Sequence, residues 1–241
     1  MAARTLASHG LLPRIRVGFE KVRRWRSRGA SLGPRQLVQT MRLQRRVVGG
    51  GRVYVSGRAA VRLRQGARIE IPSGGRLMLG SGGSNDVMDA DRLRAAVYLG
   101  SGARLVVDGR ARLGYGTKIR VAPGATLTIG DGVYVNARCL IIASHDVTIG
   151  AGSLLGWDCQ VQDDSFHQIR RTDGSWPPVK RPTVIGEHCW LGSGVLVLAG
   201  VTIGSGSVAG ARSVVSRDVP ERTLVAGAPA APVRGEIEWR V

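Results

Sequence analysis

The sequence predicts an all-β fold in which short strands wind into stacked triangular coils, and three observations support this prediction. A six-residue period runs through the chain from about residue 97. Glycine is abundant, with 35 residues among 241. Aromatic residues make up only 5% of the chain. Small interior side chains and frequent turns are typical of repeat architectures rather than of a globule packed around aromatic rings.

Each six-residue repeat holds an aliphatic residue, then Gly or Asp, two variable positions, a small residue and a free position. Clear copies begin at Leu113, Ile149, Leu155, Ile185 and Ile203. Apolar residues of a helix would recur at three and four, and those of a simple strand at two. A unit of six fits one short strand and one turn. Three units then close a coil, and coils stack through strand hydrogen bonds with a rise of about 4.8 Å.

The parts outside the regular repeat define the organisation of the chain. Residues 1–50 form a basic helical segment, in which twelve Lys and Arg face a single Glu and supply +11 of the total charge of +18. Residues 51–96 are expected to form the first, irregular coils, with a loop at 81–92. Residues 97–235 are the hexapeptide repeats, and residues 236–241 form a C-terminal tail.

The basic segment is predicted to hold two helices. Leu12, Ile15 and Phe19 begin an apolar stripe at helical spacing, and Gly33-Pro34 opens a second helix. The first helix could pack its stripe on the body, lie on an anionic membrane surface or bind nucleic acid. Nucleic acid is the least favoured partner, because charge is its only support.

The hydropathy of the chain bears on its location. No run of 18 or more apolar residues occurs, and the N-terminus lacks the pattern of a signal peptide. We therefore expect a cytoplasmic protein, either free or peripheral at the inner face of the membrane.

One interruption of the repeat carries the strongest chemical signal. Residues 167–182 lose the period and contain three prolines, so the chain is expected to leave the coil as an extruded loop. Asp163, Asp164 and His167 stand at its start. An imidazole can take a proton from a hydroxyl near neutral pH, and a carboxylate on its other nitrogen would orient it. His145, followed by Asp146, is the alternative base.

Metal and thiol chemistry are not favoured. His145, His167 and His188 are spaced by 22 and 21 residues, so no close pair of histidines exists to start a zinc site. The three cysteines all occupy the small position of a repeat. They are expected to be buried, reduced packing residues.

Residues 183–192, 198–204 and 208–220 carry a family resemblance. These segments resemble the terminal coils of the hexapeptide-repeat acyltransferases, and in particular the sugar and polysaccharide O-acetyltransferases. The resemblance implies a left-handed parallel β-helix, which winds against the usual right-handed crossover rule. It also implies a homotrimer that uses acetyl-CoA as co-substrate.

The resemblance further assigns roles to residues. It gives the base role to His167, with Asp163 or Asp164 as its carboxylate partner. It implies a groove between neighbouring copies in which acetyl-CoA is held by Trp190, Ser193, Gly210, Ala211, Ser216, Arg217 and Arg234. Asn136 is a candidate for binding the acceptor, and Trp157 and Trp176 could stack on a sugar ring.

The predicted function is acetyl-CoA-dependent transfer of an acyl group to a sugar hydroxyl in surface or capsular polysaccharide biosynthesis. His167 would act as general base in a direct transfer within a ternary complex. The alternative is a trimeric β-helix scaffold without catalysis, recruited to a membrane or an acidic partner by its basic N-terminus.

Overall fold

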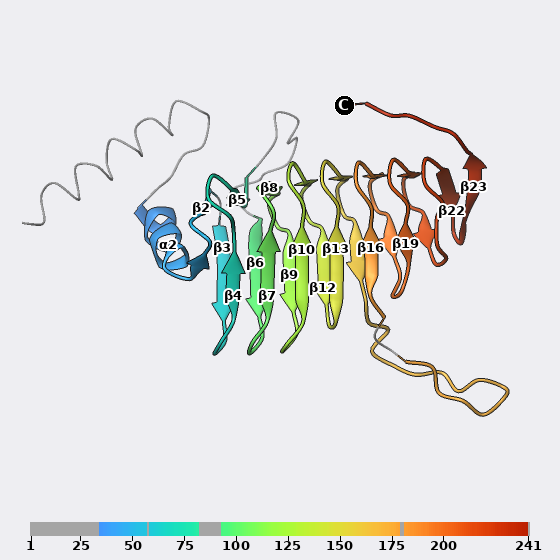
Figure 1. Ribbon diagram of the computed structural model, residues 1–241, viewed down its shortest axis with the longest axis horizontal. Coiled ribbons are helices and arrows are strands. Elements are labelled where there is room, and N and C mark those ends of the chain that lie inside the picture. The colour runs from blue at the N-terminus through green and yellow to red at the C-terminus, as the bar shows by residue number, and fades with distance from the viewer. Residues whose placement is uncertain (1–33, 57, 82–92, 179–180, 241) are drawn as a thin grey trace, which may run out of the picture.

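The computed structural model describes residues 34–56, 58–81, 93–178 and 181–240. Figure 1 shows these residues as a rod of stacked coils, with one helix at the N-terminal end. This helix, α2 (Pro34–Gln44), begins at the proline that was predicted to open it. The predicted first helix, with Leu12, Ile15 and Phe19, lies outside the described residues.

Three sheets form the walls of the rod, and we number them by their first strand. Wall 1 contains β1 (Val47–Val48), β4 (Arg68–Glu70), β7 (Arg104–Val107), β10 (Thr126–Ile129), β13 (Asp146–Ile149), β16 (Thr183–Ile185) and β19 (Thr202–Ile203). Wall 2 contains β2 (Arg52–Val55), β5 (Arg76–Leu79), β8 (Arg110–Leu113), β11 (Tyr134–Val135), β14 (Leu154–Leu155), β17 (Trp190–Leu191), β20 (Val208–Ala209), β22 (Leu224–Gly227) and β23 (Ala230–Arg234). Wall 3 contains β3 (Arg58–Leu63), β6 (Arg94–Leu99), β9 (Lys118–Val121), β12 (Leu140–Ala143), β15 (Gln160–Gln162), β18 (Leu196–Val197) and β21 (Val214–Val215).

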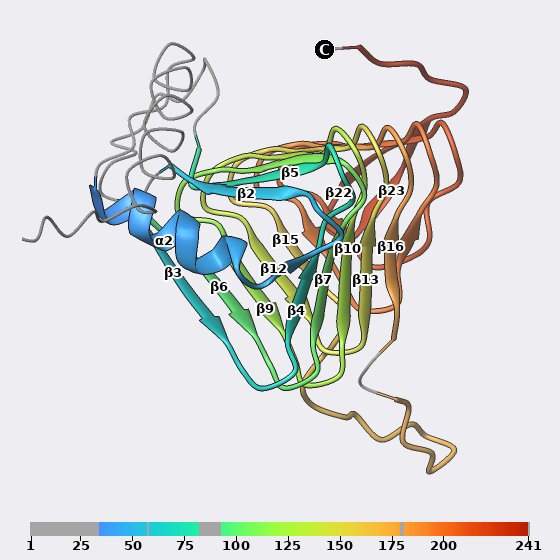
Figure 2. The same ribbon diagram turned by 60° about the vertical axis from the view of Figure 1, so that its left-hand side comes forward.

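The coils wind in a left-handed sense. Figure 2 looks toward the N-terminal end of the triangular rod, and the chain there descends along wall 3, ascends along wall 1 and returns across wall 2 as it recedes. Neighbouring coils pair in parallel, and the one antiparallel pair of named strands in the described chain is β22 with β23. The predicted left-handed parallel β-helix is thus confirmed.

The interior is a set of stacked aliphatic columns. Alternate residues of each strand point inward, so that Leu105, Leu127 and Val147 follow one another on wall 1 with almost no exposed surface. The regular registers already begin with β2 and β5, within the segment expected to be irregular. The hexapeptide period is therefore a sufficient signal for a coil but not a necessary one.

The three cysteines belong to this core, as predicted. Cys139, Cys159 and Cys189 are buried and free. A hydrogen bond with the Cys159 thiol, together with burial, raises the pKa of Cys139. Burial also raises the pKa of Cys189. Both shifts disfavour the thiolate, which is the nucleophilic form.

Both ends of the rod are covered. At the N-terminal end, Gln44 and Thr40 of α2 accept the N–H groups of Val53 and Val55, at 3.0 Å each. At the C-terminal end, β23 folds back on β22 (Figure 1). Unpaired strand edges are templates for aggregation, so these two elements protect the two end strands of wall 2.

The extruded loop leaves from one corner of the triangle. Residues 163–182 connect β15 of wall 3 to β16 of wall 1, and we call this corner the loop corner. It lies across the triangle from wall 2, and Figure 2 shows the loop projecting away from that wall. In the described part of the chain, no helix is both long and apolar enough to cross a membrane.

The stacked columns lead to a stability prediction. Leu127→Ala is expected to lower the free energy of unfolding by about 2–5 kcal/mol, because it leaves a cavity between two coils that cannot collapse. Thr128→Ala, on the outward face of the same strand, should change it by less than about 0.5 kcal/mol. Denaturant titration of both variants measures the difference, and equal midpoints would contradict this packing.

Candidate functional site

Asp163 holds the root of the extruded loop against the preceding coil. Its side chain is fully buried, and its two carboxylate oxygens accept the backbone N–H groups of Ser144 and His145, at 2.7 Å each. Its own carbonyl accepts the N–H of Arg181 from the returning end of the loop, at 2.9 Å. The carboxylate therefore joins two coils and both ends of the loop.

A tight turn next presents His167. Asp164 accepts the N–H of Phe166 through Oδ1 at 2.7 Å, and Phe166 adopts a left-handed φ of 60°. The Ser165 hydroxyl donates to the carbonyl of His167 at 3.1 Å, and His167 itself is exposed. A bulky residue with positive φ is strained, and such strain is common at functional sites.

The two aspartates bind backbone amides in this structure. Asp163 and Asp164 were predicted to orient the imidazole of His167, but each carboxylate is engaged with N–H groups of the loop root. Their positions therefore stabilise the turn that carries His167. Direct orientation of the ring by a carboxylate stays a prediction.

The alternative base lies at the same corner, one coil earlier. His145 Nε2 is 3.5 Å from Asp146 Oδ2, and both side chains are about half exposed. The loop corner thus carries both candidate histidines.

A second feature lies on wall 2, which holds an apolar pocket of about 560 Å³. Six residues assigned from the sequence line it: the donor-site candidates Trp190, Ser193, Gly210 and Ala211 and the acceptor-site candidates Asn136 and Trp157. A pocket of this size and apolar character is suited to a small organic ligand.

Small residues allow consecutive corners of wall 2 to stack closely at this pocket. A Cβ added to Gly192 would lie 2.6 Å from the backbone nitrogen of Ala211, so only glycine allows the two corners to stack. Trp190 stands over them with 42% of its surface exposed. The indole nitrogen of Trp157 is buried and has no hydrogen-bond partner among the described residues.

The sequence analysis missed the contribution of the C-terminal tail. The indole of Trp239 stacks on His188, with centroids 4.1 Å apart and planes inclined by 5°. Trp239 Nε1 also donates to the His188 carbonyl at 2.8 Å. This contact places Trp239 and Arg240 in the lining of the apolar pocket. The available signal was a tryptophan after the last repeat in a chain poor in aromatic residues.

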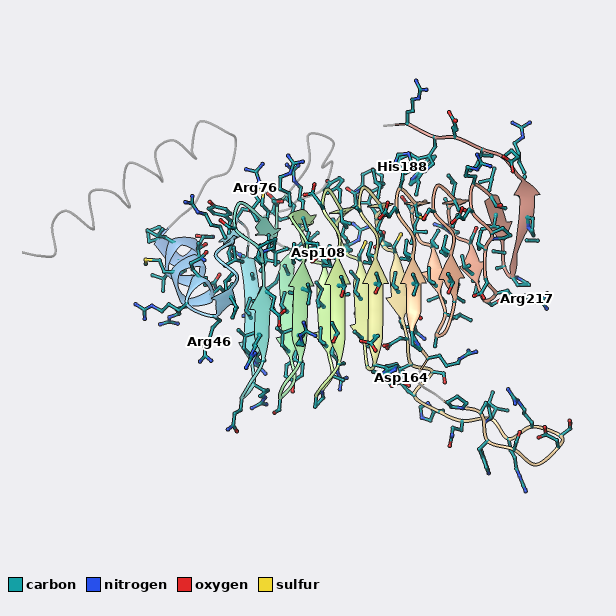
Figure 3. All side chains as sticks on the ribbon, in the orientation of Figure 1. Arg46, Arg76, Asp108, Asp164, His188 and Arg217 are labelled. Atoms are coloured by element: carbon teal, nitrogen blue, oxygen red, sulfur yellow. The ribbon has the colours of Figure 1, made fainter. Side chains whose placement is uncertain are left out.

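The remaining predicted site residues lie elsewhere. Ser216 and Arg217 follow β21 at the loop corner, and Trp176 lies in the extruded loop with Arg170 over its ring at 6.0 Å. Arg234 pairs with Leu224, which lines the apolar pocket. Figure 3 shows Asp164 on one side of the rod and His188 on the other. The candidate residues thus form two groups on opposite sides of one chain.

The described residues contain no cluster of three His, Cys, Asp or Glu side chains that could hold a metal ion.

The buried Asp163 leads to a second stability prediction. Asp163→Asn leaves one oxygen for two amide donors, so the free energy of unfolding should fall by about 1–3 kcal/mol. Asp173→Asn is the matched control, because Asp173 is exposed and its hydrogen bonds are local ones to Ser175 within the loop. Thermal unfolding and hydrogen exchange of the Ser144 and His145 amides measure the effect. Unchanged exchange at these amides would contradict the proposed anchor.

Comparison with known proteins identifies relatives of this chain. The family model "Bacterial transferase hexapeptide (six repeats)" matches residues 182–217. WcaF of Escherichia coli (strain K12), named as an acetyltransferase of colanic acid biosynthesis, is 34% identical over 135 residues, which are 53% of this chain and 71% of WcaF. The galactoside O-acetyltransferase of Escherichia coli (strain K12) is 34% identical over 46% of this chain and 55% of its own length.

Solved structures include similar proteins. The hexapeptide-repeat acetyltransferase VCA0836 of Vibrio cholerae is 32% identical, with a TM-score of 0.41 over 57% of this chain and 72% of its own. A galactoside acetyltransferase in complex with coenzyme A is 28% identical, with a TM-score of 0.36 over 49% of this chain and 64% of its own. The chain spans between about half and seven-tenths of the length of the two curated relatives described above. Since it is 34% identical to WcaF across more than two thirds of that relative, the chain belongs to the hexapeptide-repeat acetyltransferase family.

Proposed function

We propose that this protein transfers the acetyl group of acetyl-CoA to a sugar hydroxyl during the synthesis of a surface polysaccharide. The observation that carries this proposal is the apolar pocket on wall 2. Its lining combines candidate residues for binding acetyl-CoA with candidate residues for binding the sugar acceptor. The names of the relatives support the substrate class, because WcaF is named for colanic acid and another relative for galactosides.

The lining of the pocket suits the two substrates. Gly210 and Ala211 line the pocket with little side chain, which suits the close approach and hydrogen bonds that the thin pantetheine arm of acetyl-CoA needs. Trp157 and Trp190 line the pocket with flat apolar rings, which suit stacking on a sugar or an acyl chain. Arg234 pairs with the pocket residue Leu224 at the end of the wall, and its guanidinium group suits binding of the nucleotide phosphates of CoA.

A complete site requires a second copy of the chain. His167, Ser216 and Arg217 belong to the loop corner, whereas the pocket lies on wall 2 across the triangle. We propose a homotrimer in which each loop corner faces the pocket of the neighbouring copy. Three identical head-to-tail contacts then close a ring with three equal sites.

The proposed chemistry is general-base catalysis by His167. The imidazole of His167 takes the proton of the sugar hydroxyl as that oxygen attacks the thioester carbonyl carbon. The carbon–sulfur bond then breaks, the new ester bond remains, and the same proton passes to the departing thiolate of CoA. The acetyl group moves directly between the two bound substrates in a ternary complex. Because acetyl-CoA is a cytosolic metabolite, we place the reaction in the cytoplasm.

Loss of the base is the first functional test. His167→Ala is expected to lower kcat for acetyl transfer by about 10²–10⁴-fold, since the hydroxyl is then a poor nucleophile. The assay measures release of the CoA thiol with sugar acceptors. His145→Ala is the matched variant at the same corner and should retain most activity. If His145→Ala instead lost most of its activity while His167→Ala stayed active, His145 would be the general base.

Mixed trimers test the sharing of sites. His167→Ala and Ala211→Trp, which fills the pocket, should each be inactive alone. When the two are co-assembled in equal amounts, every mixed ring holds one intact pocket opposite one intact His167. Activity should then return to about a quarter of the wild-type value. Continued inactivity of mixed trimers would place the whole site within one chain.

Binding of CoA distinguishes the proposed enzyme from a scaffold without catalysis. Calorimetry of the full chain should detect CoA binding that Ala211→Trp abolishes. No heat of binding at millimolar CoA would favour the alternative of a trimeric scaffold without catalysis.

A second proposal concerns the basic N-terminal segment, which we assign to the anionic inner face of the membrane. The exposed side chains Val38 and Met41 of α2 lie among basic residues that include Arg42, Arg45 and Arg46. Apolar and basic groups on one segment suit an interface with acidic lipids.

Liposome flotation tests this assignment. The full chain should float with vesicles that contain acidic phospholipid and remain below with neutral vesicles, because attraction to the negative surface provides most of the binding. Met41→Glu should weaken flotation. Equal binding to both kinds of vesicle would contradict the electrostatic part.

A further inference from the structure

The N-terminal half of wall 2 presents arginines in register. On its outward face, Arg52, Arg76 and Arg110 occupy one column, since Arg52 pairs with Arg76 and Arg76 with Arg110. Arg112 stands two residues further along β8, beside Met78 in the next column. Neighbouring strands are about 4.8 Å apart, so these guanidinium groups repel one another unless anions lie between them.

The described residues supply little negative charge to this column. Asp131 accepts the backbone N–H of Arg110 at 2.6 Å and approaches its Nε at 3.5 Å. Arg112 lies over the ring of Tyr134, at 5.6 Å from the centroid. In the described part of the chain, Arg52, Arg76 and Arg112 form no ion pair. Asp108, at the preceding corner, is the other exposed carboxylate near β8.

These arginines line a hollow rather than a convex surface. Arg76, Arg110 and Arg112, with Met78 and Tyr134, surround a depression of about 380 Å³. Figure 3 shows Arg76 on the same side of the rod as His188. Trp239, which stacks on His188, lines the apolar pocket. The volume is within the range of sites for small ligands.

The hollow adjoins the apolar pocket on the acceptor side. Strand β11 and the residue after it connect the two, because Tyr134 lines the hollow and Asn136 lines the pocket. The donor candidates Trp190 and Gly210 lie on later coils, on the other side of Asn136. A ligand that reached from the hollow to Asn136 would therefore enter from the side away from acetyl-CoA.

We propose that the acceptor is an acidic glycan, and that Arg76, Arg110 and Arg112 bind its anionic group while a hydroxyl reaches the apolar pocket. This assignment of a substrate class rests on the proposed function. Guanidinium groups bind carboxylates and phosphates through paired hydrogen bonds. A depression that continues toward the apolar pocket suits a glycan, since one chain can bind the arginines and present a hydroxyl to the pocket.

The test measures binding without acetyl-CoA, so its result is independent of catalysis. Calorimetry of the full chain compares tetragalacturonate with its neutral methyl ester. The charged oligomer should bind at least about tenfold more tightly, because charge-assisted hydrogen bonds to arginine are lost in the ester. Arg76→Gln combined with Arg112→Gln should remove this preference. Arg94→Gln combined with Arg120→Gln removes the same charge from wall 3 and should preserve it.

Further titrations identify the recognised anion and test other binding partners. Inorganic pyrophosphate is titrated in parallel, and a preference for it over tetragalacturonate that depends on Arg76 and Arg112 assigns phosphate as the recognised group. Equal binding of the charged and neutral oligomers, with no such pyrophosphate binding, overturns the proposal. Equal losses in both double variants overturn it as well. If Arg76→Gln combined with Arg112→Gln weakened binding only to vesicles of acidic phospholipid, the arginines would be a membrane contact instead.

The two proposals fail in different ways. If anions bind through Arg76 and Arg112 but no acetyl transfer occurs, the proposed function is wrong and the anion site stands. If acetyl transfer occurs with equal KM for charged and neutral acceptors, the function stands and the acidic acceptor is excluded. Where both hold, the wall 2 variant should raise KM for the charged acceptor and leave kcat unchanged.

Discussion

Parallel pairing between successive coils is the constraint on which the rest of this structure depends. Within a wall, each inner strand forms backbone hydrogen bonds with the strand of the coil before it and with the strand of the coil after it. Its N–H and C=O groups therefore depend on the neighbouring coils for their partners. The same pairing aligns inward side chains into columns such as Leu105, Leu127 and Val147. Small and aliphatic residues are required because three walls leave a narrow interior.

This rigidity also determines where chemistry is placed. A closed triangular section presents three walls and three corners, and groups on different faces of one chain cannot approach one another. The loop corner carries His167 and His145, while wall 2 carries the apolar pocket. Asp163 fixes the loop root by binding two amides of the previous coil, so the start of the segment that carries His167 is anchored to the rod. A site that uses both faces therefore needs a neighbouring copy.

Particular residues show how far the sequence could predict this arrangement. The six-residue period predicted the coils, the cysteine burial and the loop at residues 167–182, because each follows from local spacing. It could not show that Ser216 and Arg217 stand apart from Trp190 and Ser193, since slips in the period hide which corner a residue occupies. The spacing also could not show that the carboxylates of Asp163 and Asp164 bind backbone amides of the loop root, and their orientation of the His167 ring stays a prediction. The lining role of Trp239 depends on a long-range contact with His188 that no local pattern encodes.

The central claim is that one copy supplies the imidazole and its neighbour supplies the pocket. A crystal structure of the full assembly soaked with CoA tests it most directly. The account predicts a CoA sulfur in the wall 2 pocket of one copy, within hydrogen-bond reach of His167 from the adjacent copy. A thiol bound far from every His167 imidazole, or beside His167 of the same chain, would contradict it.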